Sequence, residues 1–156
     1  MRISKLIIYL IIFLFSISGN FSLAEDYSDS DITKVVMLGS GNPFPDPKRS
    51  GPSVAVVVNG VPYLFDAGAG VWQATGAATP KYGGKIKALE SGNISKVFIT
   101  HLHSDHVVGL PSLILLPWAL GRDAPLEVWG PPGTEHMIKH LVEAYREDVG
   151  SRKYGL

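Results

Sequence analysis

Short apolar runs separated by glycine and proline turns predict strands from residue 33 onward. Residues 53–58 and 61–65 are rich in β-branched and aromatic side chains, and Asn59-Gly60 between them predicts a hairpin with a type I′ turn. Further apolar runs predict a buried strand over 33–38 and strands over 95–100 and 126–129. The pattern therefore predicts a sheet in which the strands flanking Asn59-Gly60 are antiparallel.

Longer apolar patterns predict helices between and after these strands. Residues 107–120 are mostly apolar; Pro111 suits a first turn, and Pro117 is expected to kink or end the helix. Residues 135–148 carry a single apolar stripe, with Thr134 as the expected N-cap. A shorter helix is expected over 85–90, within an irregular segment from 71 to 92. Strands mixed with helices predict the α/β (α+β) class.

The most continuous apolar segment lies at the start of the chain. Basic residues and an apolar run to residue 17 are followed by Ser22-Leu23-Ala24, which fits a small-x-small cleavage site. This predicts a signal peptide over 1–24; an uncleaved anchor is the alternative, although anchors usually need about 20 apolar residues. Residues 25–32 are acidic and polar, and predict a flexible lead-in. We therefore expect an exported protein, periplasmic or secreted, with no stable membrane anchor after cleavage.

Charge and cysteine content narrow the function classes. Arg2 and Lys5 are the only charges in residues 1–24, so of 14 basic and 14 acidic residues, 12 and 14 remain, a formal charge of −2. The chain therefore has no surplus of positive charge to attract a polyanion such as RNA, which argues against a nucleic-acid partner. The chain has no Cys, which excludes disulfides and thiolate metal ligands.

The candidate chemistry is concentrated in one run after the strand predicted over 95–100. It contains His101, His103, Asp105 and His106, and imidazole and carboxylate are ligands that Zn²⁺, Mn²⁺ and Fe accept. His101 and His103 lie two apart and share one face if the strand continues, so they can converge on one ion. Asp105 and His106 are expected in the turn that follows, beside a second ion. Core packing is a poor explanation for three of the chain's five histidines within six residues.

The other two histidines, His136 and His140, are four apart and share a helix face. Their spacing matches part of the H-E-x-x-H zinc pattern, but Met137 stands where that pattern has Glu. They fall on the polar side of the predicted helix. We therefore interpret them as surface histidines rather than metal ligands.

Several motifs occur in a characteristic order along the chain. They are Leu38-Gly39-Ser40-Gly41, Asp46-Pro47-Lys48-Arg49-Ser50-Gly51-Pro52-Ser53, Phe65-Asp66-Ala67-Gly68, Thr100-His101-Leu102-His103-Ser104-Asp105-His106 and Gly130-Pro131-Pro132-Gly133. Over about residues 33–145 the chain thereby resembles the metallo-β-lactamase superfamily, in its ribonuclease Z and arylsulfatase-like branch. The proline-rich second motif is more similar to the arylsulfatase-like members.

The resemblance implies an αββα sandwich of two similar halves with a dinuclear site at one edge. It implies that His101 and His103 bind the first metal, and that Asp105 and His106 bind the second. Asp66 is expected to support a ligand histidine by accepting a hydrogen bond. Asp105 is the expected catalytic residue, which orients the attacking water or accepts its proton. Two zinc ions are the expected cofactor, with Mn or Fe as alternatives; the resemblance assigns no substrate-binding residue.

This chain departs from the family pattern after residue 106. The family takes a further His, a bridging Asp and a final His from its second half, and no later residue of this chain matches them. We therefore expect residues 33–156 to form the N-terminal half of such a domain, incomplete and with sheet and helix faces left exposed.

Three functions are compatible with these features. The first is an exported dinuclear-zinc hydrolase of small anionic sulfate or phosphate esters, similar to arylsulfatases or phosphodiesterases. The second is a ribonuclease Z-type endonuclease that processes transfer-RNA 3′ ends, and the third is an inactive fragment without the second-half ligands. A β-lactamase proper is a lesser option. The family also forms homodimers, so a homodimer is expected as a possible assembly.

Overall fold

The structure is a computed structural model that describes residues 32–154. The signal peptide predicted over 1–24, and the lead-in up to residue 31, lie outside the described residues. Within residues 32–154, no helix combines the length and apolar character needed to cross a membrane.

Five strands form one mixed sheet in the order β1-β2-β3-β4-β5. Its strands are β1 Lys34–Gly39, β2 Ser53–Val58, β3 Val61–Phe65, β4 Lys96–Phe98 and β5 Glu127–Trp129. The first three strands pair antiparallel, whereas β3, β4 and β5 run parallel to one another. The chain is therefore a mixed α/β protein, as the pattern of strands and helices predicts.

The hairpin between β2 and β3 agrees with its sequence pattern residue by residue. Val58 pairs with Val61, and the two turn residues between them, Asn59 and Gly60, have φ values of 50° and 76°. Left-handed backbone at both positions is what a type I′ turn requires, and asparagine and glycine adopt it at the least cost. The predicted antiparallel hairpin is confirmed.

β1 forms, but the prediction that it is buried is wrong. It is the edge strand of the sheet, and the side chains of Val35 and Met37 are 70% and 65% exposed. Only the alternate positions, Val36 and Leu38, face the core. One face of this strand is covered and the other is not, so alternation replaces continuous burial.

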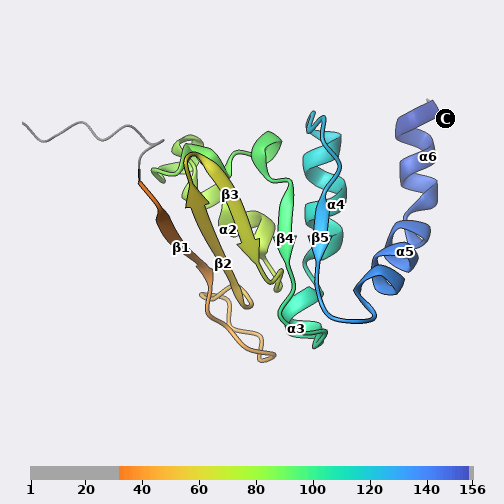
Figure 1. The fold of residues 1–156 in the computed structure, drawn as a ribbon, viewed down its shortest axis with the longest axis horizontal. Helices are drawn as coiled ribbons and strands as arrows, with labels where there is room; N and C mark the ends of the chain where they lie inside the picture. Colours follow the sequence, from red (N-terminus) through yellow and green to blue (C-terminus); the bar gives the residue numbers. More distant parts are fainter. Residues whose placement is uncertain (1–31, 155–156) are drawn as a thin grey trace, which may run out of the picture.

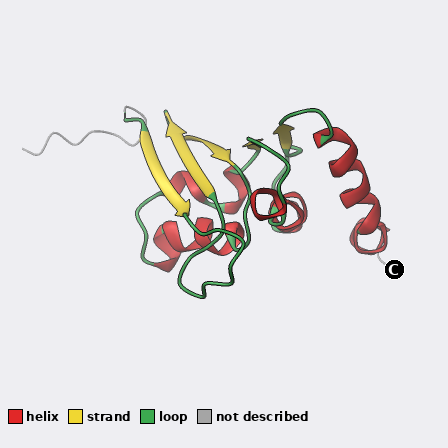
Figure 2. Cartoon of the chain, turned by 90° about the horizontal axis from the view of Figure 1, so that it is seen from below, coloured by secondary structure: helices red, strands yellow, loops and turns green. Residues whose placement is uncertain are grey.

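The helices α2 Val71–Ala78 and α4 Leu110–Ala119 lie against one face of the sheet (Figures 1 and 2). Leu64 and Val97 from the sheet meet Val71, Leu110 and Leu113 from these helices, and all five side chains are fully buried. Burying each of them removes apolar surface worth about 1.5–3 kcal/mol from water. This layer of helices on one sheet face contains the core.

The opposite face of the sheet carries a row of aromatic side chains. Phe98 stacks on Phe65 with ring centroids 5.3 Å apart and on Trp129 at 4.7 Å, and the ring of Tyr63 lies 6.4 Å from that of Phe98. Phe65 and Trp129 remain 38% and 41% exposed. Residues 32–154 therefore form one sheet with one helical layer, and leave the second sheet face open, as a half-sandwich would.

Several helix predictions need correction. The segment 71–92 contains the unpredicted helix α2, and the helix expected over 85–90 is replaced by short 3₁₀ turns, of which η2 Lys87–Leu89 is one. The helix expected over 135–148 is two helices, α5 Thr134–Ala144 and α6 Arg146–Tyr154. Thr134 is not the N-cap: Gly133 takes that position with φ 101°, and the Thr134 hydroxyl donates to the Pro131 carbonyl at 2.8 Å.

The helix expected over 107–120 forms as α4, but it begins only at Leu110. A four-residue helix, α3 Ser104–Val107, precedes α4. Pro111 lies in the first turn of α4 as predicted, and Pro117 lies inside its last turn, where it is buried, before the helix ends at Ala119. A proline here removes only one hydrogen bond close to a helix end, so α4 stops rather than bends.

A buried arginine, Arg122, fastens the end of α4 to the loop before β4. Its guanidinium donates to the carbonyls of Leu113 at 2.8 Å, Ile114 at 3.0 Å, Ile94 at 3.2 Å and Ala124 at 2.9 Å. The side chain is only 6% exposed, and this burial lowers the pKa of Arg122 from its ordinary value. The cation is compensated by the dipoles of these four carbonyls, two of which belong to the middle of α4.

Candidate metal centre

The candidate site lies where β3 and β4 end side by side. These strands are parallel neighbours, and Phe65 on β3 is paired with Phe98 on β4. The carboxyl ends of parallel strands meet at the same sheet edge, so the residues after each strand are brought together. Asp66 follows β3 directly, and Thr100 and His101 follow β4 after one intervening residue.

Asp66 is the central hydrogen-bonding residue at this edge of the sheet. The residue is 7% exposed, and its backbone has φ 60°, one of two left-handed non-glycine positions in residues 32–154. Its amide N–H donates to the Phe98 carbonyl at 2.8 Å, and its own carbonyl accepts the Ser53 hydroxyl at 2.9 Å. These bonds hold the left-handed turn that directs the carboxylate toward the loop after β4. Strained backbone held in this way is a feature of functional sites.

The Asp66 carboxylate is shared between two partners. One oxygen accepts the Thr100 amide N–H at 2.8 Å, and the other lies 2.8 Å from Nδ1 of His106. An ionised carboxylate only accepts, so a hydrogen bond at this distance requires the proton on Nδ1 of His106; in the neutral ring, Nε2 then keeps its lone pair. Nε2 lies 3.7 Å from the nearer Asp105 carboxylate oxygen. This is the arrangement of a carboxylate that orients a metal-binding histidine.

The three histidine rings of the predicted run gather at one place. The ring centroids of His101 and His106 are 4.0 Å apart, and those of His101 and His103 are 4.6 Å apart. His101, Asp105 and His106 are half-buried, and His103 is exposed. Within residues 32–154, no three His, Asp or Glu side chains are already set around a common point in the way a bound ion requires. The ligand set therefore stays a prediction.

The residues nevertheless fit a divalent metal in two respects. The donor types are neutral imidazole and carboxylate, which zinc accepts, and His106 is already fixed with Nε2 available. His103 is exposed, so its ring can turn toward an ion without disturbing the core. The donor types and the fixed ring of His106 therefore fit a divalent metal in their chemistry.

The backbone under Asp105 and His106 differs from the prediction. They lie in the short helix α3 rather than in a turn, with His103 as its N-cap residue. The turn after β3 locks this helix, because the Ala67 amide donates to the His106 carbonyl at 2.7 Å. A side chain at Gly68 would place its Cβ 2.7 Å from the Asp105 carbonyl oxygen, so only glycine permits this approach.

Sequence reasoning missed Thr100 and Gly68 as contributors to the site. Thr100 precedes His101 directly, and its hydroxyl lies within hydrogen-bonding distance of Asp66 and of His101. A polar β-branched residue next to a ligand run is the signal that could have identified it. Gly68 had a signal as well, since it stands in a Gly-rich turn after a strand.

The second histidine pair lies elsewhere, on α5. His136 and His140 are exposed, and their rings meet edge to face with centroids 4.4 Å apart. The opposite side of α5, through Met137, Ile138 and Leu141, packs against the core. Both side chains therefore lie on the solvent face, as interpreted from the sequence.

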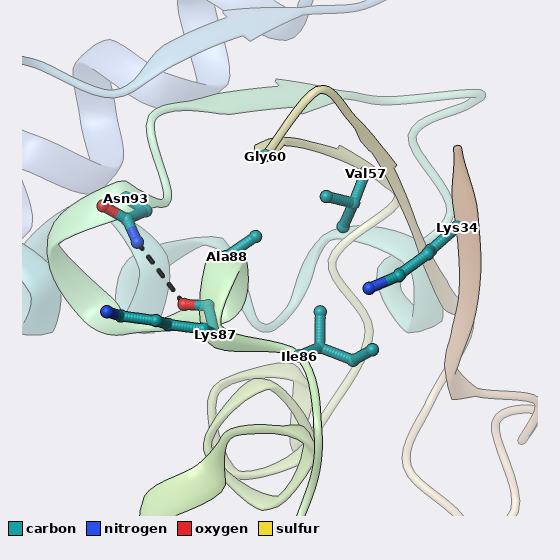
Figure 3. A pocket seen from close by; sticks show the side chains of 7 residues that line it. All are labelled: Lys34, Val57, Gly60, Ile86, Lys87, Ala88 and Asn93. Carbon is teal, nitrogen blue, oxygen red and sulfur yellow. Dashed lines mark hydrogen bonds between the residues drawn. The ribbon is translucent and has the colours of Figure 1, made fainter. Parts of the chain in front are cut away.

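Two hollows differ in what they offer. One, of about 340 Å³, lies directly beside Asp105 and is bordered by the loop that contains Phe44 and Arg49. The other, of about 210 Å³, lies at the hairpin end of the sheet, between Lys34, Gly60, Lys87 and their neighbours (Figure 3). Its lining contains no His, Asp or Glu. Of these two hollows, only the first has metal-capable side chains in its lining, Asp46 and Asp105.

Known proteins resemble this chain over most of its described part. A family model described as "Anti-Pycsar protein Apyc1" matches residues 33–125. Ribonuclease Z of Mycobacterium marinum is 36% identical over 122 residues, and ribonuclease Z of Mycolicibacterium paratuberculosis is 38% identical over 122 residues. Each match covers 76% of this chain and 40% of the relative.

Solved structures agree with the sequence relatives. The short form of human tRNase Z superposes with a TM-score of 0.61 at 33% identity, over 72% of this chain and 40% of that one. A metallo-β-lactamase fold protein of Bacillus subtilis superposes with a TM-score of 0.54 at 18% identity, over 69% and 42%. The second likeness supports the fold alone. The chain thus spans about 40% of the length of the ribonuclease Z relatives it matches.

Proposed function

We propose that this chain is part of a metal-dependent hydrolase of phosphodiester bonds. The premise is that the chain belongs to the metallo-β-lactamase superfamily, in its ribonuclease Z-like branch, and to the family described as anti-Pycsar protein Apyc1. The observation that carries the proposal is the Asp66–His106 pair at 2.8 Å, at a sheet edge shared with His101, His103 and Asp105. The family relationship accounts for the fold; this pair supports the chemistry.

Each side chain of the site has a proposed task. His101 and His103 are proposed to hold one zinc ion, and Asp105 and His106 a second, with Mn or Fe as alternatives. Bound zinc would lower the pKa of a coordinated water to about 7 and offset charge on the phosphate oxygens. Asp105, half-buried with a carboxylate oxygen 3.7 Å from Nε2 of His106, would orient that water and accept its proton. Asp66 keeps His106 in the required ring-proton state.

The substrate proposed is the phosphodiester backbone of RNA, because the relatives are named as ribonuclease Z and tRNase Z. This departs from the expectation of a small anionic ester: the comparisons support the arylsulfatase interpretation less well. The formal charge of −2 without residues 1–24 supplies no general attraction for RNA. Binding would therefore depend on the ions and on local contacts, such as Arg49 beside the hollow at Asp105.

Export remains a separate proposal. The signal peptide predicted over 1–24 would carry the protein away from cytosolic precursor transfer RNA. A reporter fused after residue 24 tests it: secretion of the reporter supports export, and retention in the cytosol favours a transfer-RNA substrate. A homodimer is likewise proposed only from the family relationship, and light scattering of the purified chain would test it.

The test of the hydrolase proposal uses the purified chain loaded with zinc. Zinc content is measured first, and then turnover of bis-nitrophenyl phosphate, nitrophenyl sulfate and a precursor transfer RNA. We expect bound zinc and cleavage of a phosphodiester. His106→Ala should bind less zinc and lose cleavage, whereas His136→Ala, which changes an exposed residue outside the site, should do neither. Cleavage of the sulfate alone would restore the arylsulfatase interpretation. Absence of bound zinc in the unmodified chain would favour the inactive-fragment alternative.

A further inference from the structure

We propose that Thr100 is a positioning residue that transmits the orienting effect of Asp66 to His101, so that one carboxylate fixes the ring-proton position of two histidines. The inference rests on the metal site proposed above. It goes beyond the pairing expected from the family resemblance, which assigns Asp66 a single histidine partner.

The geometry places the Thr100 hydroxyl between three polar groups. Its Oγ1 lies 3.0 Å and 2.9 Å from the two Asp66 carboxylate oxygens, and 3.0 Å from Nδ1 of His101. The Thr100 amide N–H also donates to Asp66 at 2.8 Å. Backbone and side chain are therefore held by the same carboxylate, and a β-branched side chain has little rotamer freedom to leave this arrangement.

The number of available protons determines which group donates in each of these hydrogen bonds. A hydroxyl has one proton to donate and lone pairs to accept with, whereas an ionised carboxylate only accepts. Asp66 already receives the His106 ring N–H and the Thr100 amide N–H, which is the role of a carboxylate anion. The Thr100 hydroxyl proton therefore goes to Asp66, and the Thr100 oxygen is left as an acceptor. Nδ1 of His101 must then carry a proton in order to donate to it.

The opposite arrangement is unfavourable. If Thr100 donated to an unprotonated Nδ1 of His101, its oxygen would face both Asp66 oxygens within 3.0 Å with no proton between them. Lone pairs would oppose lone pairs in a partly buried setting, where an unsatisfied acceptor is most costly. The first arrangement leaves the Nε2 lone pair available on both His101 and His106. One buried carboxylate thereby leaves Nε2 of two candidate ligands free to bind a metal.

The experiment reads the ring-proton positions directly, without metal or substrate. Long-range ¹⁵N–¹H correlation spectra of the metal-free chain, at a pH where imidazole is neutral, distinguish Nδ1–H from Nε2–H forms. We expect the Nδ1–H form for both His101 and His106 in the unmodified chain. In Thr100→Val, which keeps the β-branched shape without the hydroxyl, His101 should shift toward the Nε2–H form while His106 stays unchanged. Thr100→Ser should restore His101.

A second readout is zinc affinity, measured by competition with a chromophoric chelator. We expect Thr100→Val to weaken binding about tenfold, the lower end of the loss found when an outer hydrogen bond to a ligand is removed. Thr100→Ser should bind within about threefold of the unmodified chain, since the hydroxyl that supports the ligand is kept. An Nε2–H form of His101 in the unmodified chain would overturn the proposal, as would a Thr100→Val spectrum that leaves His101 unchanged or alters His106 equally. Failure to cleave any ester bears on the proposed function alone, because the spectra require neither metal nor substrate.

Discussion

Replacing Asp66 should destabilise the metal-free fold in a graded way. In Asp66→Ala, the Thr100 amide and Nδ1 of His106 lose a charged acceptor that lies 2.8 Å from each. The Thr100 hydroxyl loses the same acceptor, but it can turn to Nδ1 of His101 at 3.0 Å, so we count no loss for it. Hydrogen bonds to charged groups contribute about 1.5–3 kcal/mol each. Since His106 is half-buried and can regain water, we take the lower end for both and expect a loss of about 3 kcal/mol.

The left-handed backbone of Asp66 adds a separate contribution. Its φ of 60° suits aspartate, asparagine and glycine, whereas alanine there costs about 1 kcal/mol more. Asp66→Ala should therefore lose about 4 kcal/mol and Asp66→Gly about 3 kcal/mol. Asp66→Asn keeps the backbone preference and one acceptor oxygen, and should lose about 1–2 kcal/mol. Against a typical total of about 5–15 kcal/mol, these losses are large.

Urea unfolding in the presence of a chelator, followed by tryptophan fluorescence, measures these free energies. The control is Asp123→Ala, which removes an exposed carboxylate and should change stability by no more than about 0.5 kcal/mol. The reasoning about the carboxylate fails if Asp66→Ala unfolds within about 1 kcal/mol of the unmodified chain. The reasoning about the backbone fails if Asp66→Gly is less stable than Asp66→Ala.

Three further predictions concern other parts of the molecule. Arg122→Met removes the guanidinium donors from four buried or partly buried carbonyls and should lower the free energy of unfolding by about 2–4 kcal/mol, measured in urea. Gly68→Ala would place a Cβ 2.4 Å from the nearest backbone carbon and should lower the melting temperature measured by circular dichroism, whereas Gly92→Ala, with nothing within 4 Å, should not. His106→Ala should reduce the zinc bound per chain, measured by mass spectrometry of the metal, while His136→Ala should leave it unchanged; equal losses would refute the assigned site.

Local signals were sufficient for the hairpin and for most strands. The segments 53–58 and 61–65 are strands over those same residues, because β-branched side chains and Asn59-Gly60 favour the same arrangement. β1 also forms where expected, but sequence could not show that one of its faces stays uncovered. The burial of an edge strand depends on which elements cross it, and that is a property of the whole fold.

The helix α2 was missed because its local signals are weak. It begins after Gly70, with no side-chain cap, and contains Gly76 in its interior. Its stability comes from tertiary burial, with Val71 and Thr75 facing the core. The 3₁₀ turns that follow have similarly little local preference. Sequence patterns fail where packing, rather than propensity, decides the structure.

The sheet face opposite the helices is uncovered within residues 32–154. Phe65, Phe98 and Trp129 stack across β3, β4 and β5 while two of the three remain over a third exposed. Stacking among neighbours recovers about 0.5–1.5 kcal/mol per pair and shields part of the apolar area. The row explains how a single-sheet arrangement keeps aromatic side chains ordered on an uncovered face.

The candidate site shows why a ligand run is an incomplete criterion for metal binding. The run from His101 to His106 is local, since its four candidate ligands lie within six residues. Its ring-proton states, however, depend on Asp66, which is 34 residues from Thr100 and 40 from His106. The parallel pairing of Phe65 with Phe98 sets that approach. A change in β3 that shifts this register by one residue would turn Asp66 away while leaving every ligand in the sequence. A chain with the intact run but a displaced acid should therefore bind zinc weakly, and the two motifs must be assessed together.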